Sequence, residues 1–572
     1  MSLTLYPLGD YIQLLQRKNL QLEFSGAPLT REVSLVSCDS RQVVPGTLFI
    51  CKGAHFKVEF LQSAKEQGAF AYLSEKRYDQ VDLPCILVSD VRLAMALLAD
   101  FYYNHPSAKL GVVGITGTKG KSSTAYYLKY IFDEYLAAKG QPASGVISSI
   151  ETYDGVEKFE SHLTTPEPLD LERHFANGVA TGMRYLTMEV SSQALKYDRV
   201  KNVEFAAAVF LNIGMDHISP IEHPDFEDYF ASKLRIFSQA AAACVNLDCD
   251  HADRVLEAAR RSCPRMITFS QKDPSATIFG SQVRKVGGDI LFRVKTPRYS
   301  REFRLTMPGL FNVQNALAAL AVCEAVGVPE QYAFAGLMKA RVPGRMEVYA
   351  NADEKVTVIV DYAHNRLSFE TLFQSVREEY PGRRIVTVFG CPGYKAYDRR
   401  KDLGEISGQY SDLVILTEED AGEEPVEEIC RDIAQYVEQG GCDYSIVPDR
   451  AVMGCQVPTV ILLTGKGAET RQKRGIEYID CPSDVDYAKE YLHEYDVQHG
   501  MDGMSKVRAL LDVLPLLRRY EGRTIVIKYG GCALDAASTD TILEDAAALQ
   551  SVGVRVILVH GGGKEISALL ER

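Results

Sequence analysis

The sequence predicts an α/β protein built from several domains. Through most of its 572 residues, short apolar segments suited to buried strands alternate with segments of helical periodicity. This alternation is typical of parallel sheets covered by helices. Many of the apolar segments end in glycine-rich or polar sequence, and in a parallel sheet such ends gather at one edge, where ligands bind. We therefore expect the functional residues to follow the strands.

The composition argues against a nucleic-acid or membrane protein. Hydrophobic residues make up 46% of the chain, enough to supply a core for each of several domains. The net charge of −13 is unfavourable for binding a nucleic acid or an anionic membrane. No apolar run approaches the roughly 20 residues of a membrane span, and residues 1–10 lack the pattern of a secretion signal. We expect a cytoplasmic protein without membrane insertion, and the sequence carries no signal for an oligomeric state.

Residues 1–109 form the first predicted domain. Strand candidates lie at 47–51, 69–73 and 85–88, and a helix over 91–103 is stopped by the Asn-His-Pro sequence that follows. Asp39, Ser40 and Arg41 form a short polar motif in this region. A solvated turn explains that motif as readily as a binding site does.

The second predicted domain, residues 110–343, begins with a phosphate-binding pattern. A strand over 110–115 enters a glycine and threonine turn that opens directly into a helix over 121–136. Backbone N–H groups of such a turn can surround phosphate, Lys121 can neutralise the outer phosphates, and Ser122 or Ser123 can ligate Mg²⁺. The alternative is a glycine-rich turn without a ligand, since five residues rather than four separate Gly114 from Gly120.

Further polar side chains follow the next strands of this domain, predicted at 185–190, 206–212 and 243–246. Glu189 and Asn212 close two of these strands, and Asp216 with His217 comes just beyond the second. A carboxylate and an imidazole near phosphates could hold Mg²⁺. The alternatives are a helix-capping role for Glu189 and a structural role for His217. Lys233, judged by its own helical segment, is expected to be a surface lysine.

Residues 344–498 form a second α/β series, with strands at 356–360, 384–389, 412–416 and 459–463. Each strand ends in polar or glycine-rich sequence, so we expect this domain and the preceding one to present their strand ends to a shared cleft. Arg345, in the hinge at 341–345, is placed to reach a nucleotide. After residue 503 the pattern starts afresh, with strands near 523–529 and 554–559, a helix over 538–550 and two glycine-rich turns that suggest another phosphate site.

An ordered series of motifs carries a family resemblance. The motifs are Asp39-Ser40-Arg41, Gly117-Thr118-Lys119-Gly120-Lys121-Ser122-Ser123, Thr164-Thr165-Pro166-Glu167, Glu189-Val190-Ser191-Ser192, Asp216-His217, Tyr229 to Lys233, Gly309 to Asn315, Gly344-Arg345-Met346-Glu347, Asp361-Tyr362-Ala363-His364 and Gly465-Lys466-Gly467-Ala468-Glu469. On these motifs, residues 1–498 resemble the Mur ligases, and most closely the MurE family, which adds an amino acid to UDP-N-acetylmuramoyl-L-alanyl-D-glutamate in peptidoglycan synthesis.

The resemblance implies a UDP-sugar-binding domain, a central ATP-binding domain and a carboxy-terminal domain for the incoming amino acid. Lys121, Glu189, His217 and Lys233 would be catalytic, and Lys233 would carry a CO₂-derived carbamate. Mg²⁺ would be held by Ser122, Glu189, His217 and the modified Lys233. ATP would contact Gly117, Thr118, Lys119, Gly120, Lys121, Ser122, Ser123, Asn312, Arg345 and Asp361, the UDP-sugar peptide would contact Ser40, Thr164, Thr165, Ser191 and Arg199, and the amino acid would contact Lys395, Asp420, Gly465 and Glu469.

The resemblance also implies a reaction through an acyl phosphate, and one departure from the family bears on the amino acid added. Where diaminopimelate-adding members have D-N-P-R, residues 418–424 carry five carboxylates and Gly422 replaces the arginine. This acidic loop favours a cationic side chain, so we expect L-lysine or another diamino acid, unless the loop is simply solvated. A folylpolyglutamate-type amide ligase and a relative without catalytic activity are the competing hypotheses.

Residues 504–572 resemble the start of an N-acetylglutamate kinase. Lys528, Gly530, Gly531 and the sequence His560-Gly561-Gly562-Gly563 match early motifs of that family, whose later ATP-binding half is absent. The resemblance implies a bifunctional fusion with a partial amino-acid-kinase module, without kinase activity in this chain.

Overall fold

A computed structural model describes residues 4–26, 28–53, 56–161, 163–216, 218–219, 222–450, 458–499, 501, 520, 522–529, 546–547, 549–551 and 553–560. His217 lies outside the described residues. The chain forms two compact units, one comprising residues 1–348, 358–452 and 460–487, the other comprising residues 349–357, 453–459 and 488–572. None of the helices in the described part of the chain is long and apolar enough to cross a membrane.

The first sheet has five strands in the order β1-β5-β4-β3-β2. Its elements are α1 (Leu8–Arg17), β1 (Gln21–Ser25), β2 (Leu35–Ser37), η1 (Ser40–Gln42), β3 (Thr47–Ile50), α2 (Val58–Glu66), β4 (Ala69–Ser74), β5 (Cys85–Val88), α3 (Val91–Tyr102) and η2 (Ser107–Lys109). All neighbouring strands are parallel except β1, which is antiparallel to β5. The strands and the helix predicted from the sequence are confirmed within one or two residues at each end.

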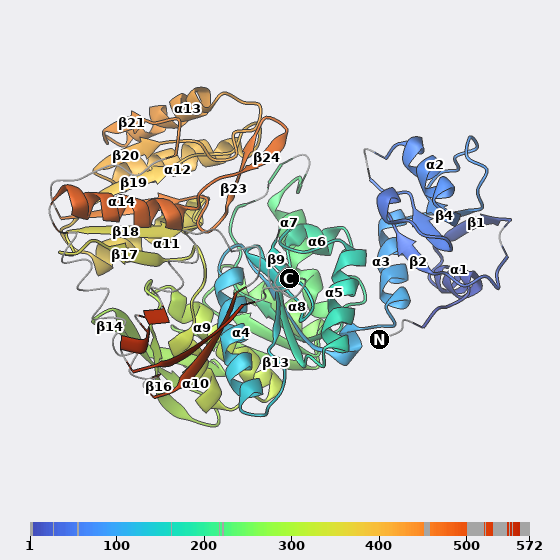
Figure 1. Cartoon of the computed structure of the whole chain (residues 1–572), viewed down its shortest axis with the longest axis horizontal. Coiled ribbons are helices and arrows are strands. Elements are labelled where there is room, and N and C mark those ends of the chain that lie inside the picture. Colours follow the sequence, from blue (N-terminus) through green and yellow to red (C-terminus); the bar gives the residue numbers. More distant parts are fainter. Residues whose placement is uncertain are drawn as a thin grey trace, which may run out of the picture. The chain divides into compact units, whose positions relative to one another are not determined.

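The second sheet has eleven strands in the order β16-β15-β14-β13-β12-β11-β6-β10-β7-β8-β9. Figure 1 labels β9, β13, β14 and β16 of this sheet. The strands are β6 (Gly111–Thr116), β7 (Gly145–Ile147), β8 (Glu151–Tyr153), β9 (Lys158–Glu160), β10 (Tyr185–Glu189), β11 (Phe205–Phe210), β12 (Ala242–Asn246), β13 (Arg265–Ser270), β14 (Ile278–Val286), β15 (Asp289–Lys295) and β16 (Ser300–Leu305). The predicted parallel sheet is its middle, and antiparallel strands extend both edges. Strand β6, which leads into the phosphate-binding pattern, therefore lies between β10 and β11, where its carboxyl end meets theirs.

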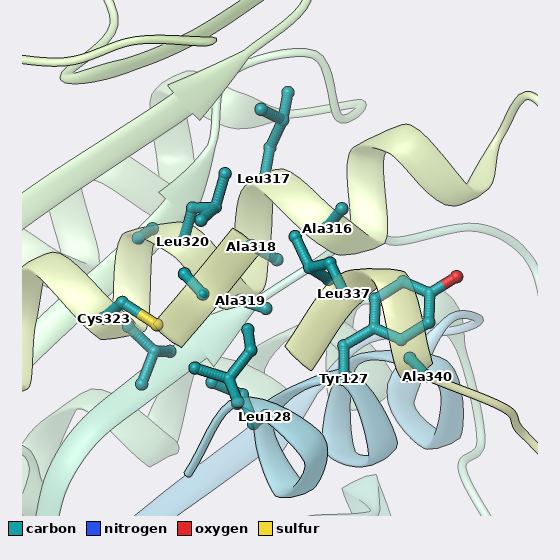
Figure 2. Close-up of a cluster of buried hydrophobic side chains, with 14 of the residues drawn as sticks. Tyr127, Leu128, Ala316, Leu317, Ala318, Ala319, Leu320, Cys323, Leu337 and Ala340 are labelled. Atoms are coloured by element: carbon teal, nitrogen blue, oxygen red, sulfur yellow. The ribbon is translucent and has the colours of Figure 1, made fainter. Parts of the chain in front are cut away.

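The helices of this domain are α4 (Lys121–Ala137), α5 (Pro168–Ala180), α6 (Ser192–Lys196), α7 (Phe226–Leu234), η3 (Arg235–Gln239), α8 (Ala252–Ser262), α9 (Asn312–Val326) and α10 (Glu330–Lys339). Figure 2 shows buried side chains of α4, α9 and α10 in one cluster, with Tyr127 and Leu128 facing the alanine-rich α9. Gly336 lets α10 approach α4 closely, since a Cβ there would lie 2.5 Å from the Cα of Ile131. This packing fixes α4, whose first turn contains Lys121 to Ser123. These residues end the segment 117–123 that the sequence predicts to bind phosphate, here named the phosphate loop.

The third sheet has six strands in the order β17-β18-β22-β19-β20-β21. Its elements are β17 (Glu347–Ala350), β18 (Val356–Asp361), α11 (Arg366–Glu379), β19 (Arg384–Phe389), α12 (Tyr397–Tyr410), β20 (Leu413–Leu416), α13 (Val426–Gln439), β21 (Tyr444–Ile446), β22 (Thr459–Thr464) and α14 (Asp484–Gln498), with a hairpin of β23 (Arg471–Arg474) and β24 (Glu477–Asp480). The four strands predicted in this region are confirmed.

The last part of the chain contributes two parallel strands, β25 (Thr524–Tyr529) and β26 (Arg555–His560), which pair along their whole length. Both agree with the predicted strands. The predicted helix over 538–550 lies largely outside the described residues, and the glycine-rich turns at 530–531 and 561–563 lie wholly outside them.

Candidate active site

The phosphate loop joins β6 to α4, as the sequence predicts. Gly120 precedes α4 in a left-handed conformation (φ +84°), and a Cβ there would collide with Oδ1 of Asn315. Only glycine meets both demands, because other residues are strained at positive φ and would also need this space. The loop is therefore fixed by its own glycine and by α9 behind it.

Asn212, which follows β11, holds the loop from the other side. Its Oδ1 accepts hydrogen bonds from the backbone N–H groups of Thr118 (3.1 Å) and Lys119 (3.0 Å), and its Nδ2 donates to the carbonyl of Lys119 (3.1 Å). An amide is the side chain that can donate and accept in this way at once. We infer that Asn212 shapes the loop, a role that its position at a strand end does not reveal.

Lys121 has only backbone partners in the described structure. Its Nζ donates to the carbonyls of Gly117 (3.0 Å) and Thr118 (3.2 Å). Burial lowers the pKa of Lys121, and the carboxylates of Glu189 and Asp216 oppose that shift. A partly buried cation of this kind is stabilised by an anion placed beside it.

Glu189 lies at the end of β10 and is 1% exposed. Its Oε1 accepts hydrogen bonds from the backbone N–H (2.9 Å) and hydroxyl (3.3 Å) of Ser149, and the Ser149 hydroxyl lies 3.3 Å from that of Ser122. Its Oε2 has no hydrogen-bond partner among the described residues. The predicted alternative of a helix cap is therefore wrong, and one carboxylate oxygen remains available to a cation.

Lys233, on α7, is buried rather than on the surface, so the expectation from its own segment is wrong. It is 2% exposed, its Nζ donates to the carbonyl of Gly117 (2.9 Å), and it lies 4.7 Å from the ring centre of Tyr229. Burial, together with the nearby charge of Lys121, holds its pKa well below the usual range. Helical periodicity alone gives no sign of this burial, since α7 packs against α6 and α8, which come from other parts of the sequence.

A cavity of about 340 Å³ is lined by Lys121, Glu189 and Asn212 and by residues of the third sheet, whereas Lys233 is not among its lining residues. Of the predicted site residues it is lined by Thr118, Lys119, Gly120, Lys121, Ser122, Ser123, Thr164, Glu189, Asn312, Arg345 and Asp361. The expected cleft between the strand ends of two α/β domains is thus present, with both sheets contributing to its wall.

The residues from the carboxy-terminal side reach toward the phosphate loop. The Arg345 guanidinium lies 4.1 Å from the ring centre of Tyr362, and its Nη2 lies 3.5 Å from the Ser122 hydroxyl. Asp361 accepts the backbone N–H groups of Met346 (2.9 Å) and Ala363 (2.8 Å), while burial raises its pKa.

Lys119 links the loop to α11. Its Nζ donates to the carbonyl of Leu367 (3.3 Å) and to the Thr371 hydroxyl, and burial lowers its pKa to about 8. On the opposite side, Asn312 donates to the carbonyl of Pro308 (2.7 Å) and lies within the cavity wall.

Three of the residues predicted to contact the sugar peptide lie together. The Thr165 hydroxyl donates to the carbonyl of Glu189 (2.9 Å) and accepts the N–H of Ser191 (3.0 Å), and Arg199 donates to the carbonyl of Thr165 (3.3 Å). Arg199 also pairs with Glu167 (2.9 Å), a residue to which the sequence assigns no role of its own.

Ser40 lies in the short helix η1, which precedes β3 of the first sheet, and does not line the cavity. Its neighbours Asp39 and Arg41 pair with each other in an exposed arrangement (2.8 Å), as expected of a solvated turn. The sequence motif is therefore a capped turn whose serine carbonyl accepts a hydrogen bond from Gln67 (2.8 Å).

The acidic loop at residues 418–424 is largely neutralised from within. Glu418 pairs with Arg474, Asp420 with Lys466 (3.1 Å), and Glu424 with Arg400 (2.7 Å). Glu423 is exposed, so it contributes little to a binding site. These partners are far from the loop in sequence, which is why the count of carboxylates overstates its negative charge.

Glu419 is the exception in this loop. It is 8% exposed, and no described residue forms a hydrogen bond or an ion pair with its carboxylate. Burial raises its pKa to about 7, against the opposing charges of Arg450, Arg399 and Lys466. Its Oε2 lies so close to Gly465 (φ +100°) that a Cβ there would collide with it.

The other residues predicted to bind the amino acid are only partly gathered. Glu469 pairs with Lys466 (2.7 Å) and lines a small adjoining cavity with Arg345 and Tyr362. Asp420 shares Lys466 with Glu469. Lys395 is exposed and has no polar partner in the described part of the chain, so it stands apart from this group.

Comparisons with known proteins agree with this architecture. A family model described as "Mur ligase middle domain" matches residues 115–323, one described as "Mur ligase, glutamate ligase domain" matches residues 344–467, and one described as "Amino acid kinase family" matches residues 523–572.

Two relatives are named UDP-N-acetylmuramoyl-L-alanyl-D-glutamate--L-lysine ligase. The protein from Enterococcus faecalis is 36% identical over 85% of this chain and 98% of its own length. The protein from Streptococcus thermophilus is 38% identical over 80% of this chain and 92% of its own length. A solved UDP-N-acetylmuramoyl-L-alanyl-D-glutamate--2,6-diaminopimelate ligase has the same fold, with a TM-score of 0.60, 23% identity, and coverage of 87% of this chain and 100% of its own.

Proposed function

Because this chain belongs to the Mur ligase family, a family of ligases of peptidoglycan precursor synthesis, we propose that it joins L-lysine to UDP-N-acetylmuramoyl-L-alanyl-D-glutamate at the expense of ATP. The names of the relatives support both the sugar-peptide substrate and the choice of lysine. The observation that carries the proposal is the cavity in which Lys121 and Glu189 of the second domain face Arg345 and Asp361 from the hinge and third sheet.

The geometry supports a reaction through an acyl phosphate. An oxygen of the D-glutamate side-chain carboxylate attacks the γ-phosphorus of ATP, and the bond between that phosphorus and the oxygen of ADP breaks. Lys121 and Arg345 stabilise the charge on the transferring group, because both line the cavity that would hold it. The α-amino nitrogen of lysine then attacks the acyl carbon, loses a proton to water, and displaces phosphate. Positioning and charge do most of this work, so no nucleophilic side chain is required.

Ser122 and Glu189 would hold a magnesium ion, with His217 as a further ligand. The unpartnered Oε2 of Glu189 and the hydroxyls of Ser122 and Ser149 form an oxygen-rich group of the kind that Mg²⁺ prefers. Bound there, the ion would supply positive charge to the phosphates. Asn212 keeps the loop in shape by accepting the backbone N–H groups of Thr118 and Lys119.

Lys233 is suited to carry a carbamate. Burial favours the neutral amine, which can attack the carbon of CO₂ to form an N–C bond and release a proton. The product is an anion close to the phosphate loop, where it could face a cation. In the absence of the modification, the amine donates to the carbonyl of Gly117.

Glu419 is our candidate for recognising the lysine side chain. A buried carboxylate without a partner gains most from an incoming ammonium group, and it disfavours neutral side chains. The paired carboxylates of Glu418, Asp420 and Glu424 have no such need. Within the acidic loop, Glu419 is therefore the residue that we expect to select lysine. Glu469 lines the small adjoining cavity.

A phosphate-release assay tests the function. The full chain is incubated with ATP, Mg²⁺ and UDP-N-acetylmuramoyl-L-alanyl-D-glutamate, and lysine, ornithine, diaminopimelate, alanine or glutamate is added in turn. We expect lysine to give the largest rate and a tripeptide product. Efficient use of diaminopimelate alone would refute the choice of amino acid, and turnover without any UDP-sugar substrate would favour a folylpolyglutamate-type ligase.

A further inference from the structure

Ser192, His223 and Asp228 form a continuous hydrogen-bonded row in the central domain. His223 Nε2 lies 2.9 Å from the Ser192 hydroxyl, and His223 Nδ1 lies 2.6 Å from Oδ2 of Asp228. Lys196 Nζ donates to the same carboxylate oxygen (2.6 Å). The row connects the first turn of α6 with the first turn of α7.

The order serine, histidine, aspartate is that of a hydrolytic triad, but burial excludes this role. His223 is 0% exposed and Ser192 is 3% exposed, so no substrate carbonyl can approach the serine oxygen. A nucleophile needs access as well as a base. The row must therefore hold parts of the protein in place, because it cannot react with a substrate.

The residues at both ends of the row are chain neighbours of residues that contact the proposed site. Ser192 follows Ser191, whose N–H is held by Thr165, and the same Thr165 hydroxyl binds the carbonyl of Glu189. At the other end, Asp228 precedes Tyr229 on α7. The two faces of the proposed site, the end of β10 and the helix that carries Lys233, are thus joined through one imidazole.

His223 also supports Tyr229 directly. The two rings meet edge to face with centres 5.2 Å apart. The Tyr229 hydroxyl lies 3.1 Å from that of Thr118 in the phosphate loop, and the Tyr229 ring faces the Lys233 amine. A change in the orientation of His223 would therefore move Tyr229, and with it the contacts of Tyr229 to the phosphate loop and to Lys233.

We propose that His223 is a positioning residue, which fixes the distance between the end of β10 and α7 and thereby the separation of Glu189 and Lys233 at the proposed magnesium site. The inference rests on the proposed function. Groups that orient residues in direct contact with a reacting centre typically change activity by about 10- to 100-fold when lost, and misplacement of that centre has a similar effect. Nδ1 must carry a proton, because the Asp228 carboxylate can only accept.

Ser192→Ala tests the proposal with little change in volume, and Asp225→Ala is its matched control. Asp225 caps the same helix, since its Oδ1 accepts the N–H of Asp228 (2.8 Å), but it is not part of the row. We expect kcat of Ser192→Ala to fall about tenfold or more with little change in KM for ATP, and kcat of Asp225→Ala to stay near the wild-type value at a similar thermal midpoint. Equal kcat values in the two variants would overturn the proposal.

A second readout does not depend on ligation. In protein with ¹⁵N-labelled histidine, His223 is assigned by the loss of its signals in His223→Gln. We expect Nδ1 to be protonated and its proton to lie downfield, and Asp228→Asn to move that proton upfield. An unprotonated Nδ1 would overturn the proposal even in an active enzyme. Failure of the wild type to ligate lysine, with the expected histidine signals, would instead count against the proposed function.

Discussion

Glu419→Gln should remove the part of the pH dependence of kcat/KM for lysine that arises from ionisation of this carboxylate. With a pKa of about 7, Glu419 is about one-tenth ionised at pH 6 and about nine-tenths ionised at pH 8. The sign follows from linkage: a bound ammonium favours the ionised carboxylate, so lysine binding strengthens as the pH rises through 7. The glutamine side chain cannot ionise, so its contribution stays constant.

The measurement is kcat/KM for lysine in wild type and Glu419→Gln at a series of pH values. Deprotonation of the attacking amine also raises the rate with pH, but it affects both proteins equally. The ratio of wild type to variant should therefore rise about tenfold between pH 6 and pH 8, from the ionised fractions alone. Norleucine, which lacks the side-chain ammonium, serves as the control substrate and should give a flat ratio. A ratio for lysine that does not change with pH would refute the role of Glu419.

Three further predictions concern the site and the framework behind it. Lys121→Ala and Lys233→Ala should each lower the ligation rate at least about a hundredfold. The first removes the cation that stabilises the transferring phosphate, and the second removes the proposed carbamate that faces the magnesium ion. A wild-type rate in either variant would exclude that lysine from the mechanism. Gly344→Ala should lower both the thermal midpoint and kcat, because φ is +65° and a Cβ would collide with the backbone N of Ala468, whereas Gly382→Ala has similar strain (φ +75°) in open space and should leave kcat unchanged. Arg450→Ala should lower the free energy of unfolding by about 3–5 kcal/mol, because it leaves the buried Asp484 without its ion-pair partner. Arg431→Ala, which breaks an exposed ion pair with Glu427, should lower it by less than about 1 kcal/mol. Equal losses in urea unfolding would contradict this prediction.

Much of the fold could be predicted because local sequence and tertiary packing agree. Strands such as β5 and β19 and the helix α4 are apolar or periodic segments bounded by turn residues, and they form where expected. The sequence does not predict the β14 to β16 meander, because much of its surface is polar and exposed and its strands lack a continuous apolar run. Pattern identifies strands that enter the core more readily than strands that extend an edge.

The candidate site could be predicted where motifs specify a local shape, as in the loop from Gly117 to Ser123. Contacts between distant segments were beyond the sequence. Ser149 holds Glu189, yet its own segment gives no functional signal, and only the resemblance suggested that Lys233 was anything but a surface residue. The acidic loop shows the same limit, since Arg474, Lys466 and Arg400 neutralise it from other elements, and Glu419 is left as a buried carboxylate without an ion pair to any described residue.

The formation of an acyl phosphate is the central claim, and the fate of one oxygen atom tests it most directly. The substrate UDP-N-acetylmuramoyl-L-alanyl-D-glutamate is labelled with ¹⁸O in the side-chain carboxylate of glutamate and converted with ATP and lysine. Attack of that carboxylate on the γ-phosphorus transfers one labelled oxygen to the released phosphate, which mass spectrometry detects. We expect one ¹⁸O in each phosphate formed by ligation. Tripeptide formation with unlabelled phosphate would contradict the mechanism.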